Sequence, residues 1–328
     1  MPGVTRDEQP KNTQPLWPLL WGLFFIAAIS SFSFRGLAII PFLGLCALFT
    51  YAISDTLKRR GVYAGNEWGA SALILLFYAI LSLTILYYSF GLTHVIITLW
   101  LGATCILATF FRTRLEFEKF SQNRRSKQLM HITDLAMSAL IVCGLFYLAL
   151  HFFLEPIYEG SVTPWIRADA MDFFIFFLAT LLLLYGHIFR MKIHWLASSL
   201  YFSFSLSVVA ILYPLTYGYD TLLHQAGLDA IAKNGSLGVF TPYYIGQYGL
   251  EMLLHTFSGW SFAAIQRWFT PLLFVTTMLI VGKMLLTEFF HESDHAQLAL
   301  ASLLMLPNIF FFSTPYSTAV ILAVASIT

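Results

Sequence analysis

Long apolar runs separated by short polar segments dominate the chain. A helix needs about 20 mostly apolar residues to cross the hydrocarbon core of a bilayer. Runs of about that length cover residues 16–34, 36–54, 70–90, 92–111, 132–153, 172–189, 195–213, 265–286 and 297–313. A tenth run begins near Thr318 and the sequence ends inside it, so we expect the chain to be the incomplete N-terminal part of a longer protein. The pattern predicts an all-α, polytopic transmembrane helix bundle with nine or ten spans.

The longest interruption of this apolar pattern lies at residues 214–264. From Asp220 onward, apolar residues recur at helical spacing, and Asn234-Gly235 form a typical helix end, because glycine tolerates the left-handed conformation there. A second amphipathic stretch follows at 243–260. Two short amphipathic helices in one loop favour a position along the membrane surface. We therefore expect two interfacial helices between the seventh and eighth spans.

Composition supports the membrane class. The sequence is 58% hydrophobic, 17% aromatic and only 11% charged, whereas a soluble domain carries about 25% charge. The formal net charge of +1 provides no general attraction to nucleic acid. The three cysteines lie inside apolar runs without metal-ligand spacing, and we expect neither a disulfide framework nor a metal site.

The basic residues are unevenly distributed and predict the orientation. With the N-terminus in the cytoplasm, only Arg35, Arg167, Lys233 and Arg267 of the 18 basic residues fall outside. The positive-inside rule therefore predicts a multi-pass protein of the plasma or inner membrane with a cytoplasmic N-terminus. In this orientation the basic stretch 112–128 is cytoplasmic and the loop 214–264 is extracytoplasmic.

The extracytoplasmic loop carries the ionisable side chains with the clearest chemical pattern. Asp220 and His224 are four residues apart on one helix face, near a helix N-terminus that favours anions. A carboxylate there can accept a proton from a substrate hydroxyl, and the same helix end can hold a phosphate. Both residues also have non-catalytic interpretations. Asp220 could be a simple N-cap of the helix, and His224 could make a hydrogen bond at the membrane interface. On the second helix, polar side chains are expected along one side: Tyr244, Gln247, Tyr248 and Glu251.

Two stretches of this loop, Y-G-Y-D-T-L-L-H (217–224) and T-P-Y-Y-I-G-Q-Y (241–248), carry a family resemblance. With the long loop around them, they resemble the GT-C class of membrane glycosyltransferases. This class includes protein O-mannosyltransferase, oligosaccharyltransferase and aminoarabinose transferase-like enzymes. The resemblance covers about residues 195–328, which we expect to form a GT-C-like membrane module. Residues 16–194 would then be a separate six-span membrane module, and residues 1–15 a polar tail.

The resemblance implies transfer of a sugar from a polyprenyl-phosphate-linked donor to a glycan or protein acceptor. The loop does not offer the several convergent oxygen ligands that a divalent metal needs, so we expect no metal or other cofactor. Asp220 would be the general base that activates the acceptor, and His224 would orient the acceptor or contact the donor phosphate. Arg267 would pair with the lipid phosphate, although an arginine there also suits a snorkelling interfacial anchor. The other implied substrate-binding residues are Tyr219, Tyr244, Gln247 and Glu251.

Two other classes of function remain open from the sequence. A non-catalytic multi-span protein could bind or move lipid-linked glycans with the same loop. A transporter is the third class. Ion- or proton-coupled transporters usually carry charged residues inside their spans, and few occur in these runs, which counts against that class.

Overall fold

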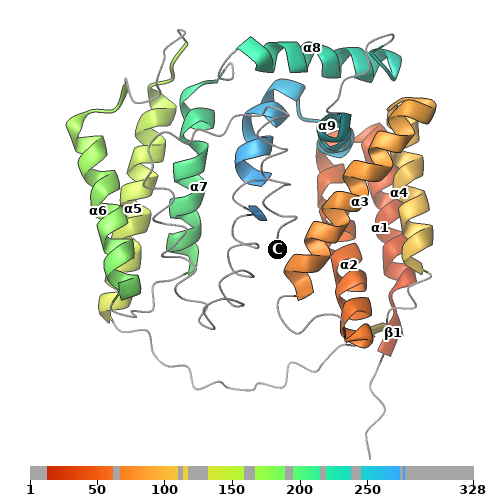
Figure 1. Cartoon of the computed structure of the whole chain (residues 1–328), viewed down its shortest axis with the longest axis horizontal. Helices are drawn as coiled ribbons and strands as arrows, with labels where there is room; N and C mark the ends of the chain where they lie inside the picture. Colours follow the sequence, from red (N-terminus) through yellow and green to blue (C-terminus); the bar gives the residue numbers. More distant parts are fainter. Residues whose placement is uncertain are drawn as a thin grey trace, which may run out of the picture.

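The computed structural model describes residues 13–61, 67–109, 114–116, 132–158, 167–188, 195–214, 219–237, 245–273 and 276–277. In these ranges the protein is an all-α helical bundle, as the sequence predicted (Figure 1). A small antiparallel pairing joins strand β1 (Thr13–Pro15) to strand β2 (Arg114–Glu116), with Gln14 opposite Leu115. The segment before the first helix therefore lies beside the segment that follows the fourth.

Seven upright helices correspond closely to the first seven apolar runs (Figure 1). They are α1 (Trp17–Ser33), α2 (Arg35–Arg60), α3 (Glu67–Phe90), α4 (His94–Thr109), α5 (Ile132–Leu154), α6 (Ala170–Ile188) and α7 (Trp195–Leu212). Helix α2 continues six residues beyond the predicted end of its run, because an amphipathic turn with three basic residues follows the apolar segment. By length and composition, α2, α3 and α5 can each cross a membrane, while α1, α4, α6 and α7 are shorter apolar helices.

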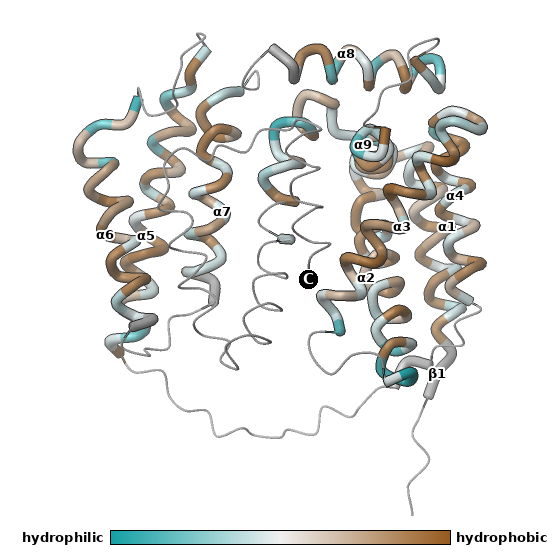
Figure 2. Tube along the Cα trace, viewed as in Figure 1, coloured by the Kyte–Doolittle hydropathy of each residue, from teal (hydrophilic) through white to brown (hydrophobic). Residues whose placement is uncertain are grey.

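Apolar residues occupy most positions along these upright helices (Figure 2), and many large apolar side chains on them are exposed. Ile29, Ile40, Leu81 and Phe146, for example, are all exposed large hydrophobic side chains. A helix that is apolar all round needs an apolar surrounding, and for exposed side chains a bilayer provides it. The surface therefore agrees with an integral membrane protein.

The upright helices pack in two groups with separate hydrophobic cores. Helices α1 to α4 surround one core, and α5 to α7 surround the other. The predicted boundary between residues 194 and 195 would separate α7 from the preceding helices, whereas in space α7 packs closely against α5.

Two further helices lie across one end of the bundle, which we call the α8 end (Figure 1). They are α8 (Tyr219–Asn234) and α9 (Ile245–Ser258), and they confirm the two short helices predicted for this loop. Gly235, with φ 78°, ends α8 as predicted. Its carbonyl accepts a hydrogen bond of 2.7 Å from the backbone N–H of Leu92, which fastens this end of α8 to the turn between α3 and α4.

A further helical stretch at 262–273 connects the two groups. Phe262 belongs to the core of α1 to α4 and Phe269 packs against it, while Trp268 packs against the core of α5 to α7. The remainder of the predicted span 265–286 lies largely outside the described residues. The predicted spans at 297–313 and from Thr318, most of the basic stretch 112–128, and Tyr244 also lie outside them.

Candidate functional site at the α8 end

The candidate site is formed mainly by α9, which lies against α2 and α3 rather than on the membrane-facing surface. Gln247, Tyr248 and Glu251 were expected along one accessible side of this helix. The structure instead buries all three, with exposed fractions of 4%, 2% and 0%. These side chains could meet a ligand only within the interior of the α8 end.

Two glycines let α9 approach α3 this closely. A Cβ atom on Gly246 would lie 2.7 Å from the Ile80 Cγ2 atom, and one on Gly249 would lie 2.8 Å from the Leu83 Cβ atom. Both distances are far below an ordinary carbon–carbon contact. The absence of side chains at these two positions therefore permits the close packing of α9 on α3.

Glu251 is the centre of a buried polar cluster. The Gln247 Nε2 atom donates a hydrogen bond of 2.6 Å to Glu251 Oε1, and Gln266 Nε2 donates one of 3.4 Å to Glu251 Oε2. Gln266, from the helical stretch 262–273, is 1% exposed. Its Oε1 atom is buried and has no hydrogen-bond partner in the described part of the protein. The sequence analysis did not select Gln266, because a single glutamine at a span end has no distinctive pattern.

The environment of Glu251 shifts its proton affinity. Burial raises the pKa of Glu251 from 4.5 to about 7, against the hydrogen bonds from Gln247 and Gln266, which lower it. A carboxyl group with a pKa near neutral pH can both hold and release a proton under physiological conditions. Such groups occur often at functional sites, although buried structural networks produce them too.

His224 connects α8 to the same region of α9. Its Nδ1 atom lies 2.7 Å from the Tyr248 hydroxyl oxygen, and both side chains are buried. Gly227, one turn after His224, leaves room for that hydroxyl, since a Cβ there would lie 3.2 Å from it. The sequence left open a hydrogen-bonding role for His224, and the structure shows a hydrogen bond between two buried side chains.

Asp220 and Tyr219 lie in the first turn of α8, at the end of that helix toward α7 (Figure 1). Their side chains are outside the described part of the structure. The helix begins at Tyr219, so Asp220 is a first-turn residue rather than the residue before the helix.

Arg267 follows Gln266 in the chain, and its side chain contacts the end of α7. Its Nε atom donates to the Ala210 carbonyl oxygen, and its Nη2 atom donates to the Ile211 carbonyl oxygen at 3.1 Å. The last carbonyls of a helix lack intrahelical partners and carry partial negative charge, so a guanidinium stabilises them. This contact gives Arg267 a structural role, and its pairing with a lipid phosphate remains a prediction.

A second polar cluster at the α8 end has a structural explanation. The Asp172 backbone N–H donates to Asp169 Oδ1 at 2.9 Å, and the Asp169 N–H donates to Asp172 Oδ2 at 3.0 Å. These reciprocal bonds form a capping box at the start of α6, and His151 Nδ1 lies 3.1 Å from Asp172 Oδ1. The spacing D-x-x-D before an apolar run was the sequence signal for this cap.

Comparisons of the chain with known protein families, with characterised proteins and with solved structures found no match. Within the described ranges there is also no group of three or more histidine, cysteine or acidic side chains placed to hold a metal ion. Any proposal for the function therefore rests on the residues of the α8 end.

Proposed function

We propose that this protein is an integral membrane glycosyltransferase that moves a sugar from a polyprenyl-phosphate-linked donor to an acceptor hydroxyl or amine on the extracytoplasmic side. The observation that carries the proposal is the arrangement of α8 and α9. They lie across one end of an apolar bundle, and α9 carries a carboxyl group buried among amide side chains. This arrangement agrees with what the resemblance of residues 217–224 and 241–248 implies.

In the proposed reaction Asp220 accepts the proton of the acceptor group. The acceptor oxygen or nitrogen forms a bond to the sugar carbon that carries the phosphate. The bond between that carbon and the phosphate oxygen breaks, and its electron pair leaves with the polyprenyl phosphate. The position of Asp220 in the first turn of α8 supports this assignment, because a helix N-terminus favours a phosphate group.

The Glu251 cluster supports a hydroxyl-rich ligand such as a sugar. The buried Gln266 Oε1 atom is an acceptor without a partner among the described residues, and buried polar atoms are normally hydrogen-bonded. A sugar hydroxyl that donates to this atom would satisfy it. Gln247 and Glu251 would then contribute to substrate binding, as the resemblance implies.

Replacing Asp220 by asparagine tests the proposal. Asparagine has nearly the same shape and still accepts hydrogen bonds, but it cannot act as a base. We expect sugar transfer to fall about a hundredfold or more. The assay would follow labelled sugar released from a panel of polyprenyl-phosphate hexoses by membranes that contain the full-length protein. Asp229→Asn is the matched control, since Asp229 is exposed on the same helix, and it should leave transfer unchanged.

Two results would contradict the proposed reaction. Normal transfer by Asp220→Asn, at equal protein level, would remove Asp220 as the base. Retention of the donor by the wild-type protein without any transfer would instead support a non-catalytic protein that binds lipid-linked glycans.

The proposal also requires the α8 end to face away from the cytoplasm. A cysteine in place of Ser236, directly after α8, should react with a membrane-impermeant maleimide added to intact cells. A cysteine in place of Lys58, at the opposite end of α2, should react only after permeabilisation. The reverse pattern of labelling would overturn the orientation.

A further inference from the structure

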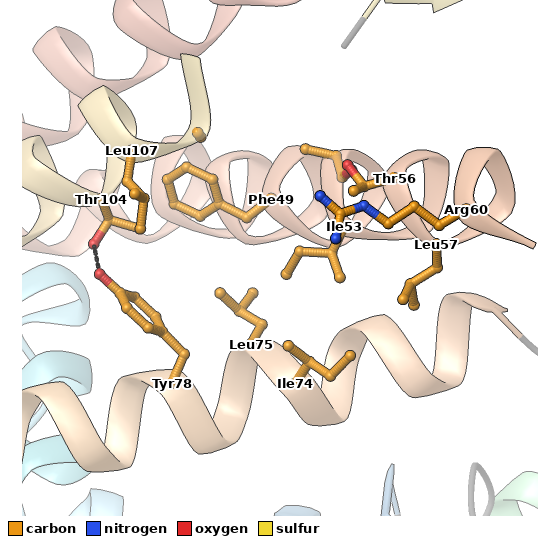
Figure 3. A pocket seen from close by; sticks show the side chains of 12 residues that line it. Phe49, Ile53, Thr56, Leu57, Arg60, Ile74, Leu75, Tyr78, Thr104 and Leu107 are labelled. Carbon is orange, nitrogen blue, oxygen red and sulfur yellow. Dashed lines mark hydrogen bonds between the residues drawn. The ribbon is translucent and has the colours of Figure 1, made fainter. Parts of the chain in front are cut away.

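At the opposite end of the bundle from α8, helices α2, α3 and α4 enclose an elongated groove with a volume of about 340 Å³ (Figure 3). Its walls are almost wholly apolar and include Phe49, Ile53, Leu75 and Ala108. The Thr56 hydroxyl group in the wall already has a hydrogen-bond partner, since its Oγ1 atom donates to the Ala52 carbonyl oxygen at 2.8 Å. An apolar cavity does not hold water well, so a hydrocarbon is its natural occupant.

The length of the groove matches half of a bilayer. Its wall on α2 runs from Phe49 to Arg60, which is about 16 Å along a helix. One leaflet of a hydrocarbon core of about 30 Å is about 15 Å deep. The Tyr78 and Thr104 hydroxyl groups, which are hydrogen-bonded at 3.2 Å, line the groove at the end away from Arg60 (Figure 3). A chain that enters at Arg60 would therefore end near the middle of the membrane.

The groove is accessible from the side of the bundle. Ile74 on α3 and Leu107 on α4 both line it, and their exposed fractions are 44% and 47%. In a membrane these half-exposed side chains would face the acyl chains of lipids. A lipid could therefore enter sideways without the helices separating.

Charge at the mouth indicates the head group. Helix α2 ends with three basic residues, and two of them have carboxylate partners. Arg59 Nη2 lies 2.9 Å from Asp55, and Lys58 Nζ lies 4.0 Å from Glu67. Arg60 lines the groove, and the part of the chain that the structure describes provides it with no carboxylate partner. Figure 3 shows its guanidinium group directed back along α2, toward Ile53 and Thr56.

We propose that this groove binds one acyl chain of an anionic phospholipid from the leaflet at the Arg60 end, with the lipid phosphate paired to Arg60. Arginine binds phosphate through two parallel hydrogen bonds, and basic residues at the interface attract anionic lipids. This site is remote from the α8 end and does not depend on the proposed function.

Native mass spectrometry of the delipidated full chain, titrated with phosphatidylglycerol or phosphatidylcholine of identical acyl chains, tests the proposal. The wild-type protein should retain one phosphatidylglycerol molecule about fivefold more tightly than phosphatidylcholine, the ratio that about 1 kcal/mol per basic residue provides. Arg60→Gln should reduce this preference to near parity. Arg59→Gln is the matched control, because Arg59 is exposed, paired with Asp55 and absent from the groove wall, and it should keep the preference.

A second pair of variants tests the groove itself. Ala108→Phe should fill the cavity and abolish retention of both lipids. Ile74→Trp would obstruct the half-exposed entrance with little change to the core, so it provides the same test if Ala108→Phe does not fold. Equal loss of preference in Arg60→Gln and Arg59→Gln would show diffuse surface charge instead of this site. Unchanged lipid retention in a folded groove variant would also overturn the proposal.

Discussion

Replacing Glu251 by glutamine should make the stability of the protein nearly independent of pH between about 4.5 and 7, where the wild-type protein loses stability as pH rises. Burial raises the pKa of Glu251 from 4.5 to about 7 in the folded state. In this window the folded protein therefore keeps a proton that the unfolded chain has released. The free energy of unfolding is therefore highest at low pH and falls as pH rises through the window. Above the window this group no longer changes it.

The expected size of this effect is about 3 kcal/mol, from a pKa difference of about 2.5 units. Glutamine has nearly the shape of a protonated glutamate and stays neutral at every pH. The variant should therefore be the more stable protein at pH 8, and the difference should largely disappear at pH 4.5. Thermal unfolding in detergent across this range measures both.

Asp229→Asn provides the control, because Asp229 is exposed on α8 and its replacement should leave the wild-type pH dependence in place. If Glu251→Gln retains the wild-type pH dependence, another group is responsible for it. The same variant separates two roles of the carboxyl group in the proposed reaction. Full sugar transfer by Glu251→Gln would show that the proton of this group takes no part in the chemistry.

The second large effect is expected at Gly249. A leucine there should destabilise the protein by about 3 kcal/mol, the upper part of the range for overpacked cores. Its Cβ atom alone would lie 2.8 Å from the Leu83 Cβ atom, so α9 would have to move away from α3. Loss of folded protein in detergent, followed as a lower unfolding temperature, measures the effect.

Gly22 provides a matched control for this variant. It lies in α1, and a Cβ atom there would meet nothing within 4 Å. Leucine is a better helix former than glycine, so Gly22→Leu should be neutral or slightly stabilising. Similar unfolding temperatures for the two leucine variants would refute the close packing of α9 on α3. Displacement of α9 should also admit water to Glu251, and the pH dependence described above should then weaken.

The upright helices illustrate what sequence pattern predicts well. A continuous apolar run is a direct consequence of the lipid surroundings and of the helix rise of about 1.5 Å per residue. The first seven predicted runs consequently agree with the observed helices to within a few residues, except at the end of α2. There the helix continues through Arg60, since polar and basic residues are good helix formers and nothing stops the helix before Gly61. The bounds of α8 also followed from sequence, because Asn234-Gly235 is a local stop signal.

The candidate site was less predictable. Gln247 and Glu251 were expected on one side of the second helix and do lie together, because a spacing of four residues brings side chains close on any helix. Their burial could not be predicted, since it depends on two glycines that fit against Ile80 and Leu83, more than 160 residues earlier in the chain. The hydrogen bond from Gln266 and the contact of Arg267 with the end of α7 are also long-range, and no local pattern encodes them.

The sequence by itself determined the helical class, the positions of the upright helices, the two transverse helices and the pairing of residues within a helix turn. All of these follow from hydrophobic pattern, helix geometry and local stop signals. Only the tertiary structure decided that α9 is enclosed by α2 and α3, that Glu251 is neutral below about pH 7, and that His224 is bonded to Tyr248. Those properties depend on which surfaces meet across large sequence separations. The burial of Glu251 results from contacts between distant segments, and its raised pKa results from that burial. No single segment determines either of them.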